Sequence, residues 1–225
     1  MPEADATLRA QLIAAARRMT AAGLNKGTAG NLSVRCVDQG EAGYLITPTG
    51  MAYDTLTPED IVFMRLDGTH AATDEKHGNR RQPSSEWRFH RDLYAARPEA
   101  GAVLHAHSPF AVSLACLRRD IPPFHYMIAR FGGDTLRCSA YATFGTQELS
   151  DATLAALEGR TACLLANHGM LVHGRDLAQA LDLGVELECL CEQYWRACQL
   201  GAPVLLDATE MATVLEKFAG YGQQS

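Results

Sequence analysis

The sequence predicts an α/β sandwich, with layers of helices and strands around one hydrophobic core. Segments with the short apolar or alternating pattern of strands gather in the middle of the chain, and segments with helical periodicity dominate both flanks. The chain has 225 residues, of which 47% are apolar and 20% are charged, as in ordinary globular proteins. This length suffices for one full core, so we expect a single domain over residues 1–225.

The first third of the chain is expected to begin with a helix and to continue with strands. Leu8, Leu12 and Met19 lie on one stripe at helical spacing, and Gly23 after them is a suitable helix stop. The expected strands lie within residues 27–37, 43–47 and 61–66. From Gly68 to Pro83 the chain is polar and without periodicity, which indicates a surface loop.

Helices and strands are expected to alternate through the rest of the chain. A helical pattern follows Pro83, and Ser108 and Pro109 suit the N-cap and the first position of a second helix. The expected helices lie at residues 84–99, 108–119, 147–159, 176–200 and 209–218. The expected strands lie at residues 101–107, 124–128, 134–138, 161–166 and 170–174.

Charge and composition exclude several classes of protein. The net charge of −6 and the pI near 5.7 argue against a general binder of nucleic acids or anionic membranes. No apolar run reaches the roughly 20 residues of a membrane span, and the polar N-terminus does not resemble a signal or transit peptide. The seven cysteines lack the spacing of a disulfide framework, so we expect reduced thiols and a cytoplasmic protein.

Two histidines close the apolar run GAVLHAH. Because side chains two positions apart in a strand project from one face, His105 and His107 can aim both imidazoles at one point. Leu104 and Ala106 would then face the core. This spacing suits two ligands of a zinc ion, and a polar strand end is the alternative. The weaker candidates among the histidines are His70, His77, His90, His125 and His173.

A third ligand is offered by His168 in the stretch LLANHGMLV, where it also ends an apolar strand. Asn167 and Gly169 equally suit an ordinary hairpin turn, so both interpretations stay open. Three histidines would leave one position of a tetrahedral zinc open, as in catalytic sites. Glu86, at the start of the helix in PSSEWRFH, could act as a base near that position.

Three short stretches could bind an anion such as phosphate. GTAGN and TPTG are loops rich in Gly, Thr and Asn, whose backbone N–H groups suit phosphate. Ser84 and Ser85 precede a helix start, which is also a suitable anion site. None of the three matches a P-loop or a G-x-G-x-x-G motif, and ordinary turn chemistry is the alternative for each taken singly.

Seven motifs agree in order and spacing with one known family. They are GLNKGTAGNLSVR, ITPTGMAYDTL, PSSEWRFH, HAHS, IPPFHYMIARFGGD, YATFGTQELS and NHGM. From about Leu8 to Tyr221 the sequence resembles the class II aldolase and adducin family, and most of all its members that cleave L-fuculose 1-phosphate. The resemblance implies a three-layer α/β/α fold with a central, mainly antiparallel sheet. It also implies a homotetramer with zinc at the subunit boundaries, where Co²⁺ or Mn²⁺ could replace the zinc.

The same resemblance assigns roles to individual residues. Glu86 resembles the catalytic acid and base, which can also bind the metal when no substrate is present. Tyr126 resembles the tyrosine that handles the proton on the aldehyde oxygen, and Tyr221 resembles a tail residue that closes a neighbouring subunit's site. The other assignments are three zinc ligands, His105, His107 and His168, and three phosphate-binding stretches, Gly30 and Asn31, Thr49 and Gly50, and Ser84 and Ser85.

The implied activity is that of a metal-dependent aldehyde-lyase. A ketose 1-phosphate would be cleaved between its third and fourth carbons to dihydroxyacetone phosphate and an aldehyde, with zinc as the Lewis acid. L-Fuculose 1-phosphate and the related deoxy- and methylthio-pentulose 1-phosphates are the candidate substrates. Glu86 should have a raised pKa in that complex. No lysine is placed to form a Schiff base, which disfavours a metal-free aldolase.

Other functions of the same scaffold stay open as alternatives. Relatives include 4-epimerases, decarboxylases and dehydratases of sugar phosphates, and the glutamate after two serines favours aldol cleavage over epimerisation. Adducin-like binding modules lack the zinc ligands, and the three histidines here speak against that interpretation. The loop between Asp67 and Pro83 is longer than in the family and the tail beyond Tyr221 is short. Both could shape the aldehyde pocket, so the substrate is left open.

Overall fold

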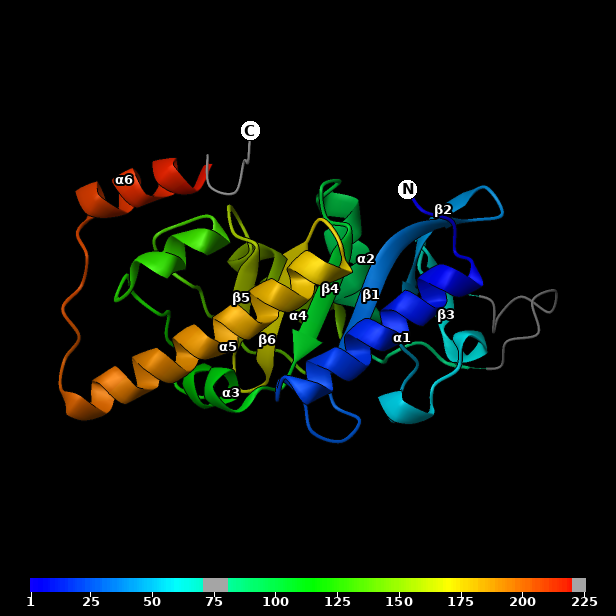
Figure 1. Ribbon diagram of the computed structural model, residues 1–225, viewed down its shortest axis with the longest axis horizontal. Coiled ribbons are helices and arrows are strands. Elements are labelled where there is room, and N and C mark those ends of the chain that lie inside the picture. The colour runs from blue at the N-terminus through cyan, green and yellow to red at the C-terminus, as the bar shows by residue number, and fades with distance from the viewer. Residues whose placement is uncertain (71–80, 220–225) are drawn as a thin grey trace.

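The computed structural model describes residues 1–70 and 81–219, and within them a six-stranded sheet lies between layers of helices (Figure 1). The strand order is β3-β2-β1-β4-β6-β5, and every neighbouring pair is antiparallel. The strands are β1 (Asn31–Asp38), β2 (Glu41–Ile46), β3 (Val62–Arg65), β4 (Ala102–Ala106), β5 (Ala162–Leu165) and β6 (Gly169–Gly174). The expected mixed α/β fold with a central antiparallel sheet is confirmed.

Helices cover both faces of this sheet. The helices are α1 (Ala6–Ala21), α2 (Trp87–Ala96), α3 (Pro109–Ala115), α4 (Gln147–Ala156), α5 (Leu177–Leu200) and α6 (Ala208–Ala219). One hydrophobic core lies between the sheet and α1, α3 and α5, and a second lies between the sheet and α2 and α4. In Figure 1, α1 and α5 cross the front of the sheet. The short 3-10 helices are η1 (Tyr53–Thr55), η2 (Pro58–Asp60) and η4 (Tyr126–Phe131).

The alternation of side chains along β4 supplies both cores and sets the direction of its histidine. Leu104 and Ala106 pack in the core under α1 and α5, as expected, whereas Val103 packs in the core under α2 and α4. Each fully buried side chain of the size of Leu or Val contributes about 1.5–3 kcal/mol to stability. His105 shares the face of Val103, and its ring lies edge-on to Phe89 of α2 at 5.4 Å.

Two expected strands are wrong. Residues 124–128 lead into the 3-10 helix η4, because the His125 imidazole accepts a hydrogen bond from the backbone N–H of Met127 and so caps a turn. The helix ends at Gly132, which adopts a left-handed conformation. Residues 134–138 form only two single bridges, Ile121 with Leu136 and Cys138 with Leu164, so their apolar pattern reflects burial without a continuous ladder.

The structure also bears on three other features: the cysteines, the apolar character of the helices and the polar loop. All seven cysteines are free, and Cys189 is exposed while Cys191, two positions on, is buried. Among the described residues, no helix has the length and apolar character that crossing a bilayer requires. Most of the expected polar loop, residues 71–80, lies outside the described residues.

Candidate metal centre and adjoining cavity

Three neighbouring parts of the sheet bring the expected ligands to one place. Asn31, the first residue of β1, pairs directly with His105 of β4. His107 follows the end of β4, and His168 lies in the tight turn between β5 and β6. Asn167 takes a left-handed conformation in that turn, as the hairpin interpretation expects, and the turn also brings His168 close to the other two histidines.

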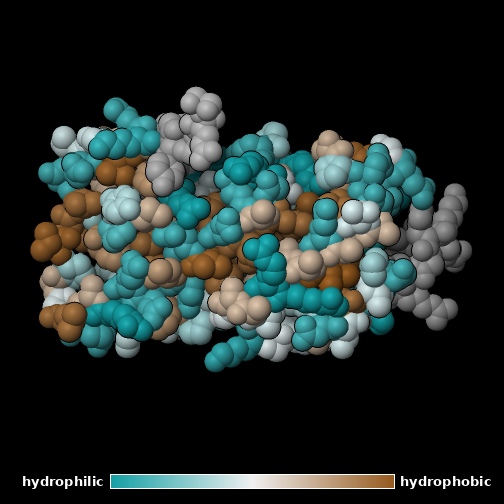
Figure 2. All heavy atoms as spheres, viewed as in Figure 1, coloured by the Kyte–Doolittle hydropathy of each residue, from teal (hydrophilic) through white to brown (hydrophobic). Residues whose placement is uncertain are grey.

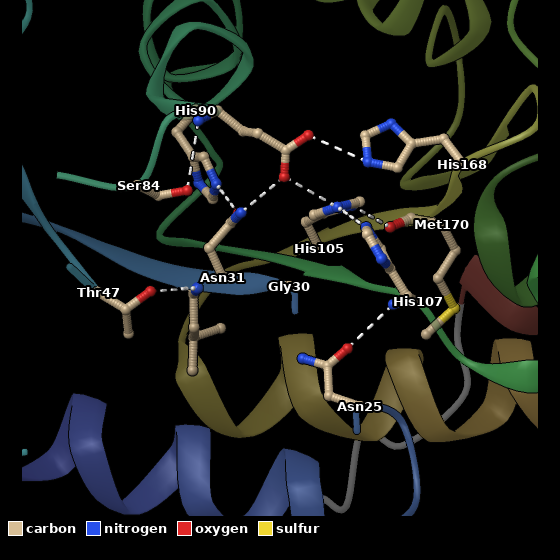
Figure 3. Close-up of polar contacts among 12 residues, drawn as sticks. Asn25, Gly30, Asn31, Thr47, Ser84, His90, His105, His107, His168 and Met170 are labelled. Atoms are coloured by element: carbon tan, nitrogen blue, oxygen red, sulfur yellow. Dashed lines mark hydrogen bonds and ion pairs between the residues drawn. The ribbon is translucent and has the colours of Figure 1, made fainter. Parts of the chain in front are cut away.

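The three imidazoles form a nearly symmetric triangle. Each pair of ring centroids among His105, His107 and His168 is 4.8 Å apart, with interplanar angles between 72° and 76°. His105 Nδ1 lies 2.9 Å from the carbonyl oxygen of Met170, which can only accept, so this nitrogen carries the proton. His105 Nε2 therefore points away from Met170 and faces His107, whose Nε2 is 2.9 Å away (Figure 3).

The Glu86 carboxylate lies against two of these three histidines. One carboxylate oxygen, Oε2, lies 3.1 Å from His105 Nε2, and the other, Oε1, lies 3.1 Å from His168 Nε2. Burial raises the pKa of the Glu86 carboxyl, but the imidazoles of His105 and His168 outweigh burial and hold its pKa well below the usual range. The group is therefore a carboxylate in this arrangement, next to nitrogens that can share a cation with it.

These residues fit a divalent metal ion. The ligand atoms of Glu86, His105, His107 and His168 all lie within 4.8 Å of one another. Glu86 Oε1 is buried and, among the described residues, accepts no hydrogen bond despite its closeness to His168. Burial, followed by the neighbouring His105 and His168, lowers the pKa of His107 to about 4, which keeps that imidazole neutral as a ligand must be.

Asn25 and Gly30 support the cluster from the side of α1. Asn25 Oδ1 accepts a 2.9 Å hydrogen bond from the backbone N–H of His107. A Cβ on Gly30, whose φ is +76°, would lie 2.2 Å from Asn25 Nδ2 and 2.7 Å from the carbonyl oxygen of His105. Only glycine therefore fits here. Asn25 has no role among the sequence predictions, because its position in the loop after Gly23 gives no periodic signal.

A second support comes from α5. Ser108 is the N-cap of α3, as expected, but its hydroxyl donates a 2.6 Å hydrogen bond to Glu188 of α5 and does not cap its own helix. The same carboxylate accepts from the backbone N–H groups of Phe110 and Ala111 at 2.8 and 2.9 Å. Glu188 thus satisfies the start of α3 and ties the residue directly after His107 to the longest helix.

A cavity of about 320 Å³ opens beside the metal cluster and contains all three expected anion-binding stretches. Backbone pairing holds two of them together, since Ser84 N–H donates to the Thr47 carbonyl and Thr49 N–H donates to the Gln82 carbonyl. No lysine or arginine occurs among the described residues that line the cavity. The lining from these stretches consists of Gly30, Asn31, Thr49, Gly50, Ser84 and Ser85.

One part of the cavity wall is largely apolar. Tyr141, Ala142 and Phe144 line it, together with Asn167 and His168. Tyr141 and Phe144 are among the exposed large hydrophobic residues, and the Arg118 guanidinium lies 5.2 Å from the Tyr141 ring. These residues belong to the YATFG motif, which carried the family resemblance but received no role. The motif itself was the signal that could have found them.

Of the two tyrosines expected to act in catalysis, the structure describes only Tyr126, which does not line this cavity. Tyr126 lies in η4, is 51% exposed, and stacks between His125 and Phe218. It lines a different and larger cavity of about 1200 Å³ between η4, α5 and α6. Tyr221 lies outside the described residues. Within one chain, the described site therefore consists of the metal cluster, the three anion-binding stretches and the apolar wall.

Comparison with known proteins was made by sequence and by structure. The family described as Class II Aldolase and Adducin N-terminal domain matches residues 10–195. A 5-methylthioribulose-1-phosphate/5-deoxyribulose-1-phosphate aldolase of Rhodospirillum rubrum is 56% identical over 225 residues, which cover 100% of this chain and 97% of the relative. An L-fuculose phosphate aldolase of Escherichia coli K12 is 45% identical over 216 residues, 96% of this chain and 95% of the relative. A solved L-fuculose 1-phosphate aldolase superimposes with a TM-score of 0.87 at 38% identity, covering 96% of this chain and 97% of that one.

Proposed function

We propose a substrate and a mechanism from the premise that this chain belongs to the class II aldolase and adducin family and is an aldolase of that family. The proposed reaction is the reversible cleavage of 5-methylthioribulose 1-phosphate or 5-deoxyribulose 1-phosphate to dihydroxyacetone phosphate and an aldehyde. The observation that carries the proposal is that one cavity is lined by residues of the metal cluster, by the anion-binding stretches and by apolar side chains. The relative named for these two substrates is 56% identical, against 45% for the fuculose phosphate aldolase.

The phosphate group of the substrate would bind to the stretches around Gly30, Thr49 and Ser84. Hydroxyl groups, backbone N–H groups and the start of α2 are the donors on this wall, and such groups bind phosphate without a lysine or arginine. The glycines allow the backbone to approach the phosphate closely. This wall fixes one end of the substrate and thereby decides which carbons reach the metal cluster.

The other end of the substrate would lie against Tyr141, Ala142 and Phe144. A methyl or methylthio group gains free energy by leaving water for such a wall, at about 25 cal/mol per Å² of apolar surface. The aldehyde from L-fuculose 1-phosphate carries an additional hydroxyl group, which needs a hydrogen-bond partner there. The apolar surface of Ala142, Phe144 and the Tyr141 ring therefore favours a substrate that ends in a methyl or methylthio group.

We propose zinc as the metal. Three imidazole nitrogens and one carboxylate oxygen form a donor set that zinc takes, and His105, His107, His168 and Glu86 would hold it. When bound, the ion would supply Lewis-acid stabilisation of the negative charge that develops beside the ketone of the substrate. With substrate in the cavity, the carboxylate of Glu86 would move away from the histidines.

Glu86 would then move the proton at the third carbon. Cleavage removes the proton from the hydroxyl on the fourth carbon and breaks the bond between the third and fourth carbons. The fourth carbon becomes the aldehyde, and the electron pair passes to the enediolate of the remaining fragment. Glu86 protonates its third carbon to give dihydroxyacetone phosphate. Away from the histidines, burial is the main influence left on Glu86, and burial raises its pKa, as an acid requires.

The proton from the hydroxyl on the fourth carbon would go to Tyr126 of a neighbouring copy of the chain. Tyr126 is exposed and does not line the cavity of its own chain, so the proposed role requires a subunit boundary at the site. Figure 2 shows apolar side chains at the end of the molecule where α5 ends and the segment to α6 begins. Leu200 and Val204 there are 92% and 91% exposed, which supports association into the expected homotetramer.

The choice of substrate is tested by a panel of ketose 1-phosphates. Zinc-loaded protein would be assayed for aldol cleavage of 5-methylthioribulose, 5-deoxyribulose and L-fuculose 1-phosphates at equal concentration. We expect kcat/KM to be highest for one of the two pentulose phosphates. A higher value for L-fuculose 1-phosphate would overturn the substrate assignment, and no cleavage of any of the three would overturn the aldolase proposal.

The role of Glu86 is tested separately by Glu86→Gln. We expect this variant to keep its bound metal, because three histidines remain, but to lose the exchange of a proton between dihydroxyacetone phosphate and water. Exchange can be followed by NMR in deuterated water, and metal content by atomic absorption. Exchange at the wild-type rate in the metal-loaded variant would refute the assignment.

A further inference from the structure

A line of buried polar side chains runs from the Glu86 carboxylate into the core beneath α2. Glu86 Oε2 accepts a 3.0 Å hydrogen bond from Asn31 Nδ2, and Asn31 Oδ1 lies 2.6 Å from His90 Nε2 (Figure 3). His90 Nδ1 lies 2.7 Å from Ser33 Oγ, which lies 2.8 Å from the Tyr94 hydroxyl. All five residues are buried. The line ends at Tyr94, well inside the protein.

The chemistry of these groups fixes the direction of each hydrogen bond. A carboxylate only accepts, so Asn31 presents its NH₂ group to Glu86 and its carbonyl oxygen to His90. His90 Nε2 must therefore carry the proton. Burial lowers the pKa of His90 to about 3, so the imidazole is neutral and its Nδ1 accepts from the Ser33 hydroxyl. The Tyr94 hydroxyl then donates to Ser33, and every donor points towards Glu86.

The spacing in two elements produces this line. Glu86 and His90 are four residues apart at the start of α2, which places them on one side of the helix. Asn31 and Ser33 are two apart in β1, so they share the face of the sheet that α2 covers. The sequence contains both spacings, but His90 was expected to be a weak candidate because nothing in the sequence shows that the two faces meet.

We propose that His90 is a positioning residue that holds the Asn31 amide in the one orientation able to donate to Glu86. With the amide rotated by half a turn, Asn31 Oδ1 would face the carboxylate and two acceptors would repel each other. The N–H of His90 excludes that orientation, since it needs the oxygen on its own side. The inference rests on the proposed aldol cleavage only in assigning Glu86 the proton transfer that this orientation serves.

Two substitutions separate positioning from mere support of the core. In His90→Gln the side chain can still present an N–H near the place of Nε2, whereas the shorter side chain in His90→Asn cannot reach Asn31. We expect His90→Asn to lower kcat for aldol cleavage by about 10- to 100-fold, the usual effect of losing a partner of a metal ligand. KM should change less than kcat, because the anion-binding stretches around Thr49 and Ser84 make no contact with His90, and His90→Gln should recover most of the lost kcat.

Metal content and unfolding by urea would be measured on both variants, so that loss of fold or of metal is recognised. Equal kcat in His90→Asn and wild type would overturn the proposal. So would an equal loss in His90→Gln and His90→Asn when both remain folded and metal-loaded. If wild-type protein shows no aldol cleavage, the proposed function is refuted. The orientation of the Asn31 amide is then tested by NMR, as described next.

The orientation has a readout that does not depend on activity. In protein labelled with ¹⁵N-histidine, NMR distinguishes the two neutral tautomers, and the spectrum of His90→Gln identifies the His90 signals by their loss. We expect a protonated Nε2 and an unprotonated Nδ1. A proton on Nδ1 would mean that His90 cannot donate to Asn31, and it would overturn the inference even in a fully active enzyme.

Discussion

Glu188 and Ser108 are joined by a 2.6 Å hydrogen bond that connects the centre of α5 to the residue directly after the candidate ligand His107. The Glu188 carboxylate also takes two backbone N–H groups at the start of α3. A negative charge in this position is favourable, since the first N–H groups of a helix lack partners within the helix. One side chain thus completes a helix and fixes the chain beside the metal cluster.

The substitution Glu188→Gln should therefore destabilise the fold by about 1–3 kcal/mol, because charge-assisted hydrogen bonds become neutral and one acceptor oxygen is lost. Urea unfolding measures this change. The matched control is Glu186→Gln on the same helix, where Glu186 forms a 3.2 Å ion pair with Arg130 that is partly exposed. The control should lose less than about 1 kcal/mol. Equal losses in the two variants would contradict the role given to Glu188.

Gly30→Ala should damage both stability and metal binding. The new Cβ would overlap Asn25 Nδ2 and the His105 carbonyl, and a positive φ adds about 1–2 kcal/mol of backbone strain. Gly27→Ala is the control, since Gly27 has a similar φ of +66° with open space around its Cβ position. The visible spectrum of cobalt-loaded protein reports the metal site. We expect the spectrum to change in Gly30→Ala and not in Gly27→Ala. An unchanged spectrum in Gly30→Ala would show that Asn25 and the His105 carbonyl can move aside without disturbing the metal site.

The buried His90 should make stability depend on pH. Its pKa in the folded protein is about 3, below the ordinary value of about 6.5, so the unfolded chain binds a proton more readily. The neutral imidazole favours folding above about pH 6.5, and this contribution is lost as the pH falls towards 3. The unfolding free energy of wild type should therefore decline more steeply than that of His90→Gln between these values. Parallel curves would contradict the expectation.

Mixed oligomers test whether a site is shared between chains. Glu86→Gln and Tyr126→Phe should each be nearly inactive alone under the proposed mechanism. After subunit exchange between the two, a hybrid contains some sites with an intact Glu86 from one chain and an intact Tyr126 from its neighbour. Random assembly should restore about a quarter of wild-type activity. A mixture as inactive as its components would show that both residues serve a site within one chain.

Where the signal was local, the sequence predicted the fold and the residues that come together in the metal cluster. The spacing of His105 and His107 gave a shared face, and the apolar alternation gave the central strands. The strand predicted at residues 124–128 is wrong because a histidine that caps a turn has the same sequence pattern as a residue in an apolar strand. Asn25, Glu188 and His90 escaped because each acts through a partner more than 50 residues away, and no local pattern records such a contact.

The direct pairing of Asn31 with His105 in the sheet has a consequence for folding. A slip of β1 against β4 by one residue would turn these side chains to opposite faces, and a slip by two would move them apart by roughly 7 Å along the strand. A slip by two keeps the apolar faces correct, so the hydrophobic cores alone discriminate weakly against it. The polar contact between Asn31 and Glu86, which stands beside His105, is formed only in the native register. The polar contacts of the candidate site thus favour the native register of β1 against β4.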